Sequence, residues 1–255
     1  MRIQKTSRQP ASSGLLPGHL EDINRLSRAS LSAEEVYVFS LCLCDNEVDR
    51  DQERFPEKTL EQLAPLFVGK SGLFDHSWSA RGQAARLYRT EVVREPERLT
   101  QAGDGYCWLK GWAYMVRTPD NQGLIAEIEG GIKKEVSVGC AVKRAVCSIC
   151  STERGQDCGH KPGEVYDGAR CFFQLEEAVD AYEFSFVAVP AQPGAGVVKG
   201  LCPAGEPAQT LRELAAGRDL CIRELDGLER EAALGRKWLF TLREEVVRMG
   251  ALADS

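Results

Sequence analysis

Short apolar segments rich in β-branched and aromatic residues recur along the first two thirds of the chain, and they limit the possible folds most strongly. Charged stretches or stretches that contain glycine and proline bound each of them, which is typical of β-strands. They lie at residues 35–44, 85–95, 106–116, 133–146, 169–175 and 180–191. So many strands and so few helices predict a mainly β, α+β fold. We expect about six or seven strands in a closed or nearly closed antiparallel barrel.

Two segments between these strands have the apolar spacing of helices. Residues 57–67 follow Pro56 and carry leucines three positions apart. Residues 120–131 follow Pro119 and end in two glycines, which commonly terminate helices. We expect these two helices to lie at the rim of the barrel.

Composition divides the chain into four parts. Residues 1–33 are polar with scattered arginines, and we expect a flexible lead-in before the barrel domain at 34–198. Residues 199–208 are rich in proline and glycine and are predicted to be a linker. From Leu211 onward apolar residues recur at heptad spacing, so residues 209–255 are predicted to form a helical, coiled-coil-like tail. The alternative for this tail is a helical hairpin packed on its own domain.

Charge and cysteine content set expectations for the compartment. The 255 residues include ten cysteines and three histidines and carry a formal net charge of -6, which gives no general attraction to nucleic acid or acidic membranes. No apolar run has the length of a signal peptide or a membrane span, so we expect neither export nor insertion. In a reducing compartment the cysteines are expected to be metal ligands or buried residues rather than disulfides.

One short segment, CSICSTERGQDCGH, combines a CxxC pair with a CxH pair further along the chain. Its four candidate ligands are Cys147, Cys150, Cys158 and His160. Three thiolates and one imidazole form a common closed zinc site, so we expect a structural Zn²⁺ with no open catalytic position. Cys171 is the alternative to His160 as fourth ligand. The metal would fold an insert, residues 147–171, that is too short to bury a core of its own.

The scarcity of histidine narrows the choice of a general base. If His160 binds metal and His19 lies in the lead-in, His76 in GLFDHSWSA is the remaining candidate. Ser137 lies in a predicted strand beside Gly139, where a substrate backbone could approach closely. From spacing alone, a serine that faces solvent is the simpler interpretation of Ser137.

Three segments, in this order, resemble the tailed-phage prohead maturation proteases, which are serine proteases with a fold similar to that of herpesvirus assemblin. The segments read GLFDHSWSA, IEGGIKKEVSVGCAV and DAYEFSFVAVPAQPGA, and the resemblance covers about residues 35–198. It implies that Ser137 is the nucleophile and His76 the general base of a Ser-His-acid triad. The candidates for the acidic third residue are Glu183, Asp180 and Asp167, in that order. The simpler interpretation of Glu183 is a strand-end charge paired with an arginine.

The resemblance implies a serine endopeptidase that cleaves scaffold protein, the major capsid protein and itself. It would act as a homo-oligomer inside the assembling prohead in the host cytoplasm, without nucleic acid or membrane as a partner. The alternative is a catalytically inactive capsid-assembly or scaffold protein with the same barrel and a structural zinc. A zinc-ribbon nucleic-acid binder is a weaker interpretation, because the insert lacks a basic surface. Self-cleavage at 190–207 is a further hypothesis.

Overall fold

The computed structural model describes Leu15, residues 18–198 and Trp238. The chain divides into two units, Met1–Pro203 and Ala204–Ser255, and the fold below belongs to the first. The predicted linker at 199–208 and the predicted helical tail at 209–255 lie outside the described residues, apart from Trp238.

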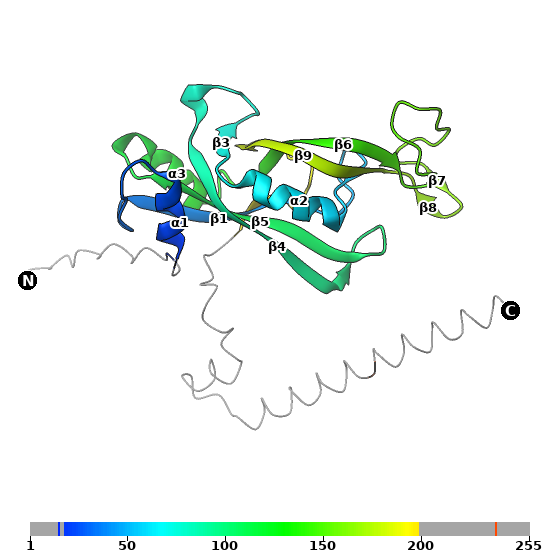
Figure 1. The fold of residues 1–255 in the computed structure, drawn as a ribbon, viewed down its shortest axis with the longest axis horizontal. Helices are drawn as coiled ribbons and strands as arrows, with labels where there is room; N and C mark the ends of the chain where they lie inside the picture. The colour runs from blue at the N-terminus through cyan, green and yellow to red at the C-terminus, as the bar shows by residue number, and fades with distance from the viewer. Residues whose placement is uncertain (1–14, 16–17, 199–237, 239–255) are drawn as a thin grey trace, which may run out of the picture. The chain divides into compact units, whose positions relative to one another are not determined.

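One eight-stranded sheet makes up most of the described fold (Figure 1). Its strands are β1 (Val36–Asp45), β2 (Glu53–Arg54), β3 (Ser71–Phe74), β4 (Ala85–Leu99), β5 (Gly105–Val116), β6 (Val136–Cys147), β9 (Phe173–Phe186) and β10 (Gly196–Val197). Neighbouring strands follow the order β10-β1-β5-β4-β3-β9-β2, and β6 also pairs with β9. The fold is therefore mixed α+β and mostly sheet, as the sequence predicts.

The expected closed antiparallel barrel is not formed by the described residues. Both β2 and β3 run parallel to β9, so the sheet is mixed rather than antiparallel throughout. One isolated bridge, between Glu135 and Gly196, joins β10 to the residue that precedes β6. Since β10 has only two residues, no ladder continues beyond that bridge.

The two strands predicted at residues 169–175 and 180–191 correspond mostly to a single long strand, β9. The segments 169–175 and 180–191 form the short β8 (Ala169–Arg170) and the long β9. The polar residues between them remain in β9 because β6 pairs along its length, with two register shifts, between Gly139 and Cys140 and between Ala141 and Val142. Long-range pairing here outweighs the weak strand preference of the local sequence.

The core lies between β1, the β4–β5 hairpin, β9 and the helix α2 (Glu57–Phe67). β1 is buried at every position, and its antiparallel partner is β5. α2 buries Leu60, Leu63 and Phe67 completely and packs against β9. The second predicted helix is α3 (Gln122–Glu129), which is followed by Gly130. Both predicted helices are therefore present.

The lead-in prediction is wrong for the helix α1 (His19–Leu26). Ile23 and His19 are buried against aromatic residues of β4 and β5, among them Tyr88 and Trp112. The His19 Nδ1 lies 2.7 Å from the hydroxyl of Tyr88. A short amphipathic helix thus docks on the sheet, although its sequence is mostly polar.

A small insert connects β6 to β9 and contains β7 (Val165–Tyr166) paired with β8. In Figure 1 these strands lie at the end of the β6–β9 ribbon that is remote from α3. Among the described residues, no helix is long and apolar enough to cross a membrane.

Candidate functional site

The pairing of β6 with β9 brings four small or polar residues onto one face of the sheet. Ser137 lies directly opposite Ser185, and Gly139 lies opposite Glu183. Residues two apart in a strand share a face, so all four point to the same side. Phe184 alternates with them and is fully buried in the core, which anchors β9.

His76 reaches this face from the loop that follows β3. β3 runs parallel to the end of β9, with Phe74 opposite Phe186. Asp75 and His76 both have left-handed backbones, with φ of 49° and 52°. Such a conformation costs a residue with a side chain roughly 1–2 kcal/mol, so the surrounding contacts must hold it. The backbone N–H of His76 donates to Ser185 Oγ at 3.1 Å.

The His76 imidazole is bonded to a buried carboxylate. His76 Nδ1 lies 2.8 Å from Glu183 Oε1, and the Glu183 side chain is only 3% exposed. An ionised carboxylate only accepts hydrogen bonds, so a hydrogen bond to it requires the proton of the ring to be on Nδ1. In the neutral ring Nε2 is then left as the acceptor, which is the tautomer that a general base needs.

Gly139 makes room for this carboxylate. A Cβ atom at position 139 would lie 2.5 Å from Glu183 Oε1, much closer than van der Waals contact. The serine-x-glycine pattern of β6 thus has a steric reason in this chain. Glycine allows the acid to lie beside the serine strand and reach the histidine.

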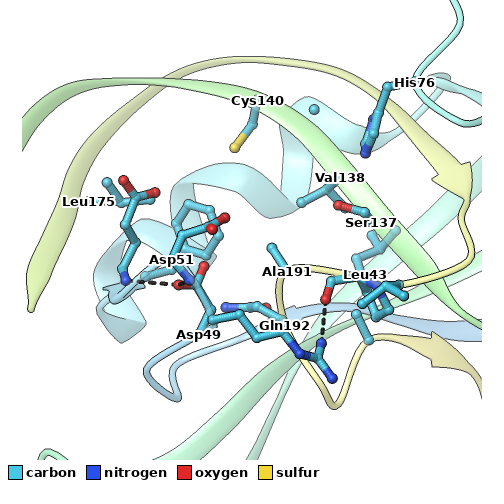
Figure 2. A pocket seen from close by; sticks show the side chains of 17 residues that line it. Leu43, Asp49, Asp51, His76, Ser137, Val138, Cys140, Leu175, Ala191 and Gln192 are labelled. Atoms are coloured by element: carbon cyan, nitrogen blue, oxygen red, sulfur yellow. Dashed lines mark hydrogen bonds between the residues drawn. The ribbon is translucent and has the colours of Figure 1, made fainter. Parts of the chain in front are cut away.

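His76 and Ser137 line the same cavity, of about 610 Å³. In Figure 2 an imidazole nitrogen of His76 is directed toward Ser137. Apolar side chains of Leu43, Phe55 and Leu175 also line the cavity. No hydrogen bond joins the two side chains in the part of the chain that the structure describes. Bonds of this kind are often long in unliganded sites and tighten when substrate binds.

The cavity lies beside the open edge of β6, beyond the bridge that ends at Glu135. One wall is formed by residues 137–140 and the opposite wall by residues 189–192. Asp49 and Asp51 also line it, and the guanidinium of Arg50 is bonded to the carbonyl of Pro190. The interior therefore favours neutral or cationic groups over anionic ones.

Cys140 also lines the cavity and is the other possible nucleophile there. Burial raises the pKa of its thiol to about 11. The thiolate is the strongly nucleophilic form, so burial disfavours attack by Cys140 at neutral pH. Ser137 is left as the side chain beside His76 that can attack a carbonyl.

The other two acidic candidates lie elsewhere. Asp180 is paired with Lys70 at 3.3 Å, and Asp167 lies in the turn between β7 and β8. Of the three candidates, Glu183 is the one that contacts His76, and its partner is this histidine rather than an arginine. No sequence motif indicates a role for Ser185, although its spacing of two from Glu183 in a strand places both on one face.

The cysteine and histidine residues of the insert form a compact cluster. The ligand atoms of Cys147, Cys150, Cys158 and His160 all lie within 4.8 Å of one another. The Cys150 and Cys158 sulfurs are 3.4 Å apart, and Cys158 Sγ lies 3.7 Å from His160 Nδ1. Zn–S bonds of about 2.3 Å in a tetrahedron place sulfurs about 3.8 Å apart. The donor set therefore fits a metal ion, and zinc is the ion that such donors prefer.

Two further contacts bear on the metal chemistry. Hydrogen bonding with Thr152 lowers the pKa of the Cys150 thiol to about 6, which favours the thiolate that a metal binds. Cys171, the alternative ligand, is buried with its sulfur 3.7 Å from that of Cys147. The compact set of four nonetheless contains His160 rather than Cys171.

Comparison with protein-family models, with curated proteins and with solved structures found no match to this chain. The geometry of the two sites is therefore what supports a function.

Proposed function

We propose that this protein is a serine endopeptidase of the kind that matures tailed-phage proheads. The single observation that supports it most is the contact between His76 Nδ1 and Glu183, with Ser137 on the same cavity. A buried acid, an oriented imidazole and a hydroxyl in this order are the parts of a Ser-His-acid triad. The prohead setting comes from the resemblance of three sequence segments.

In this mechanism His76 Nε2 takes the proton of the Ser137 hydroxyl as Oγ attacks the carbonyl carbon of the peptide. The C–O bond forms, the peptide C–N bond breaks, and the imidazolium returns the proton to the leaving amine. Water then hydrolyses the acyl-enzyme by the same route. Glu183 keeps the ring in the required tautomer and stabilises the imidazolium without being protonated.

The partners follow from the resemblance. Scaffold protein and the major capsid protein would be the substrates, and the enzyme would act as a homo-oligomer inside the assembling prohead. The cavity is lined by residues 137–140 of the strand β6, and a strand edge can pair with an extended polypeptide. In a closed barrel of the assemblin type, β6 and β10 would pair along their length. Here one isolated bridge between Glu135 and Gly196 links them, so other segments would have to close the barrel.

The second candidate is a catalytically inactive capsid-assembly or scaffold protein with the same fold. Such a protein has no need for a buried carboxylate bonded to an imidazole beside a serine. Glu183 is buried with its two oxygens bonded to His76 and Ser185, an arrangement that a Ser-His-acid triad uses and that assembly alone does not require. The contact between His76 and Glu183 thus favours the protease.

A cleavage assay tests the proposal. The purified full chain is incubated with fluorescein-labelled casein, in parallel with Ser137→Ala and with Ser79→Ala, a serine on an exposed turn. We expect wild type and Ser79→Ala to cleave equally and Ser137→Ala to lose all but a trace of activity. Casein cleavage that is the same in Ser137→Ala, or absent from all three, contradicts it.

The same incubation tests self-cleavage. We expect fragments that end within residues 190–207 from wild type and none from Ser137→Ala. Identical fragments from both would show that another protease, or no specific process, produces them.

We further infer that Cys147, Cys150, Cys158 and His160 hold one structural zinc ion. When bound, the ion would supply cross-links between the end of β6 and the insert loops, with no open position for catalysis. Metal analysis of the purified chain should give about one zinc per chain, and a strong chelator should lower the melting temperature. No zinc and no effect of chelation would contradict this.

A further inference from the structure

Ser185 makes two hydrogen bonds, and both go to the proposed catalytic residues. Its side chain is fully buried, with 0% exposure. Its hydroxyl donates to Glu183 Oε2 at 2.6 Å and accepts from the backbone N–H of His76 at 3.1 Å. A single hydroxyl thus connects the acid to the chain segment that carries the base.

The first bond fixes the rotation of the acid. Glu183 presents Oε1 to His76 and Oε2 to Ser185, so both oxygens have partners in a buried position. Without the hydroxyl, Oε2 would be a buried charged oxygen with no donor, and the carboxylate could lower its energy by turning away from His76. The plane of the carboxylate therefore depends on Ser185.

The second bond fixes the backbone of the base. His76 has a left-handed φ of 52°, and the residue before it has one as well. Such conformations persist where surrounding contacts over-determine them. The hydrogen bond from the His76 N–H to Ser185 is one such contact. Ser185 therefore contacts both Glu183, which is bonded to the imidazole, and the backbone of His76.

The position of Ser185 in the sheet argues against a purely structural role for its hydroxyl group. Ser185 lies directly opposite Ser137 in the pairing of β6 with β9. A buried strand serine needs only one acceptor to satisfy its hydroxyl, and a neighbouring carbonyl commonly provides it. Ser185 instead uses both donor and acceptor capacity on the acid and the base.

We propose that Ser185 is a positioning residue that sets the geometry of Glu183 and His76; this inference deepens the proposed protease function and rests on it. Ser185 does not contact substrate, because it is fully buried. Its effect is exerted through the hydrogen bond between His76 Nδ1 and Glu183.

Proton NMR tests the inference without relying on activity. An Nδ1–H proton bonded to a carboxylate resonates far downfield and exchanges slowly with water. We expect such a signal in the Ser137→Ala chain, assigned by its loss in Ser137→Ala/His76→Gln. Adding Ser185→Ala should remove or broaden it, whereas Ser185→Thr, which keeps a hydroxyl, should retain it. A signal unchanged by Ser185→Ala, or absent from the parent chain, overturns the inference.

Kinetics on the otherwise wild-type chain provide the second readout. Ser185→Ala should lower kcat about 10- to 100-fold, as expected for one hydrogen bond to a charged group, and leave KM unchanged. Ser185→Thr should recover part of the loss. Ser40→Ala is the matched control, since Ser40 is a buried serine on β1; it should match wild type. A wild-type kcat in Ser185→Ala would overturn the inference.

The two arms separate the possible failures. If wild type cleaves nothing but the downfield signal depends on Ser185, the protease proposal fails and the positioning of the pair stands. If alanine prevents folding, Ser185→Cys keeps a similar size with a much weaker donor and should show the same loss of signal. A cysteine variant with the full signal counts against the inference.

Discussion

At the scale of single residues, the site depends on the absence of one side chain. Gly139 has no Cβ where Glu183 Oε1 would meet it at 2.5 Å, so the acid occupies that space. Sequence alone indicates a glycine beside a candidate nucleophile, which suggests room for substrate. The structure gives a different reason, because the glycine accommodates the acid from the neighbouring strand.

Replacing this glycine should therefore reduce activity without touching the nucleophile. In Gly139→Ala the new methyl group displaces the Glu183 carboxylate, and we expect kcat for casein cleavage to fall at least about 10-fold. Gly123→Ala is the control, because a Cβ there meets nothing within 4 Å. Equal rates for the two variants would show that Glu183 does not need this space.

The identity of the acid is a separate residue-scale prediction. Glu183→Gln keeps the size of the side chain but allows its amide to donate, which favours the wrong tautomer of His76. We expect kcat to fall roughly 10³- to 10⁴-fold, as when a triad acid becomes an amide. Asp180→Asn should stay near wild type, because Asp180 is paired with Lys70. A larger loss in Asp180→Asn than in Glu183→Gln would reverse the assignment.

At the scale of elements, predictability followed the strength of the local signal. The strand at 35–44 is apolar at nearly every position and became the fully buried β1. The polar middle of β9 carries no such signal, because its strand conformation depends on pairing with β6. The sequence of α1 is mostly polar, and its burial depends on docking against Tyr88 and Trp112, which are distant in sequence.

The docking of α1 predicts a pH dependence of stability. Burial, followed by the nearby Arg89, lowers the pKa of His19 below its usual value of 6.5, and Asp22 opposes this. A neutral histidine is thus favoured in the folded state. Its contribution is complete above about pH 6.5 and is lost as the pH falls through the lowered pKa.

Chemical denaturation at a series of pH values measures this contribution. We expect the free energy of unfolding to fall more steeply between pH 7 and 5 in wild type than in His19→Asn, which has no group that titrates there. The carboxylates common to both chains cancel in the difference. Parallel curves for the two chains would show that His19 does not titrate with folding.

For the insert at residues 147–171, the sequence indicates the candidate metal ligands but leaves the fourth one open. Spacing left His160 and Cys171 as alternative ligands, and the structure places His160 in the compact set. We expect His160→Asn to lower zinc content well below one per chain and Cys171→Ser to retain it, as measured by metal analysis. Retention by His160→Asn with loss by Cys171→Ser would indicate four cysteine ligands.

At the scale of the whole molecule, the sequence predicts an α+β chain but not how its sheet ends. Closure into a barrel depends on how far β10 extends along β6, and a two-residue strand carries little sequence signal. The cavity lies beside the resulting open edge and contains the serine and the histidine that the sequence indicates. Elimination among the three histidines indicates His76, and the structure places His76 on this cavity, bonded to Glu183.

Covalent labelling by a fluorophosphonate tests the central claim most directly, since this reagent reacts with serines that a general base activates. The full chain is labelled and the modified residue is identified by mass spectrometry. The account predicts one label per chain on Ser137, and its loss in His76→Gln with the fold retained. An unlabelled chain, or a label on another residue that persists in His76→Gln, would contradict it.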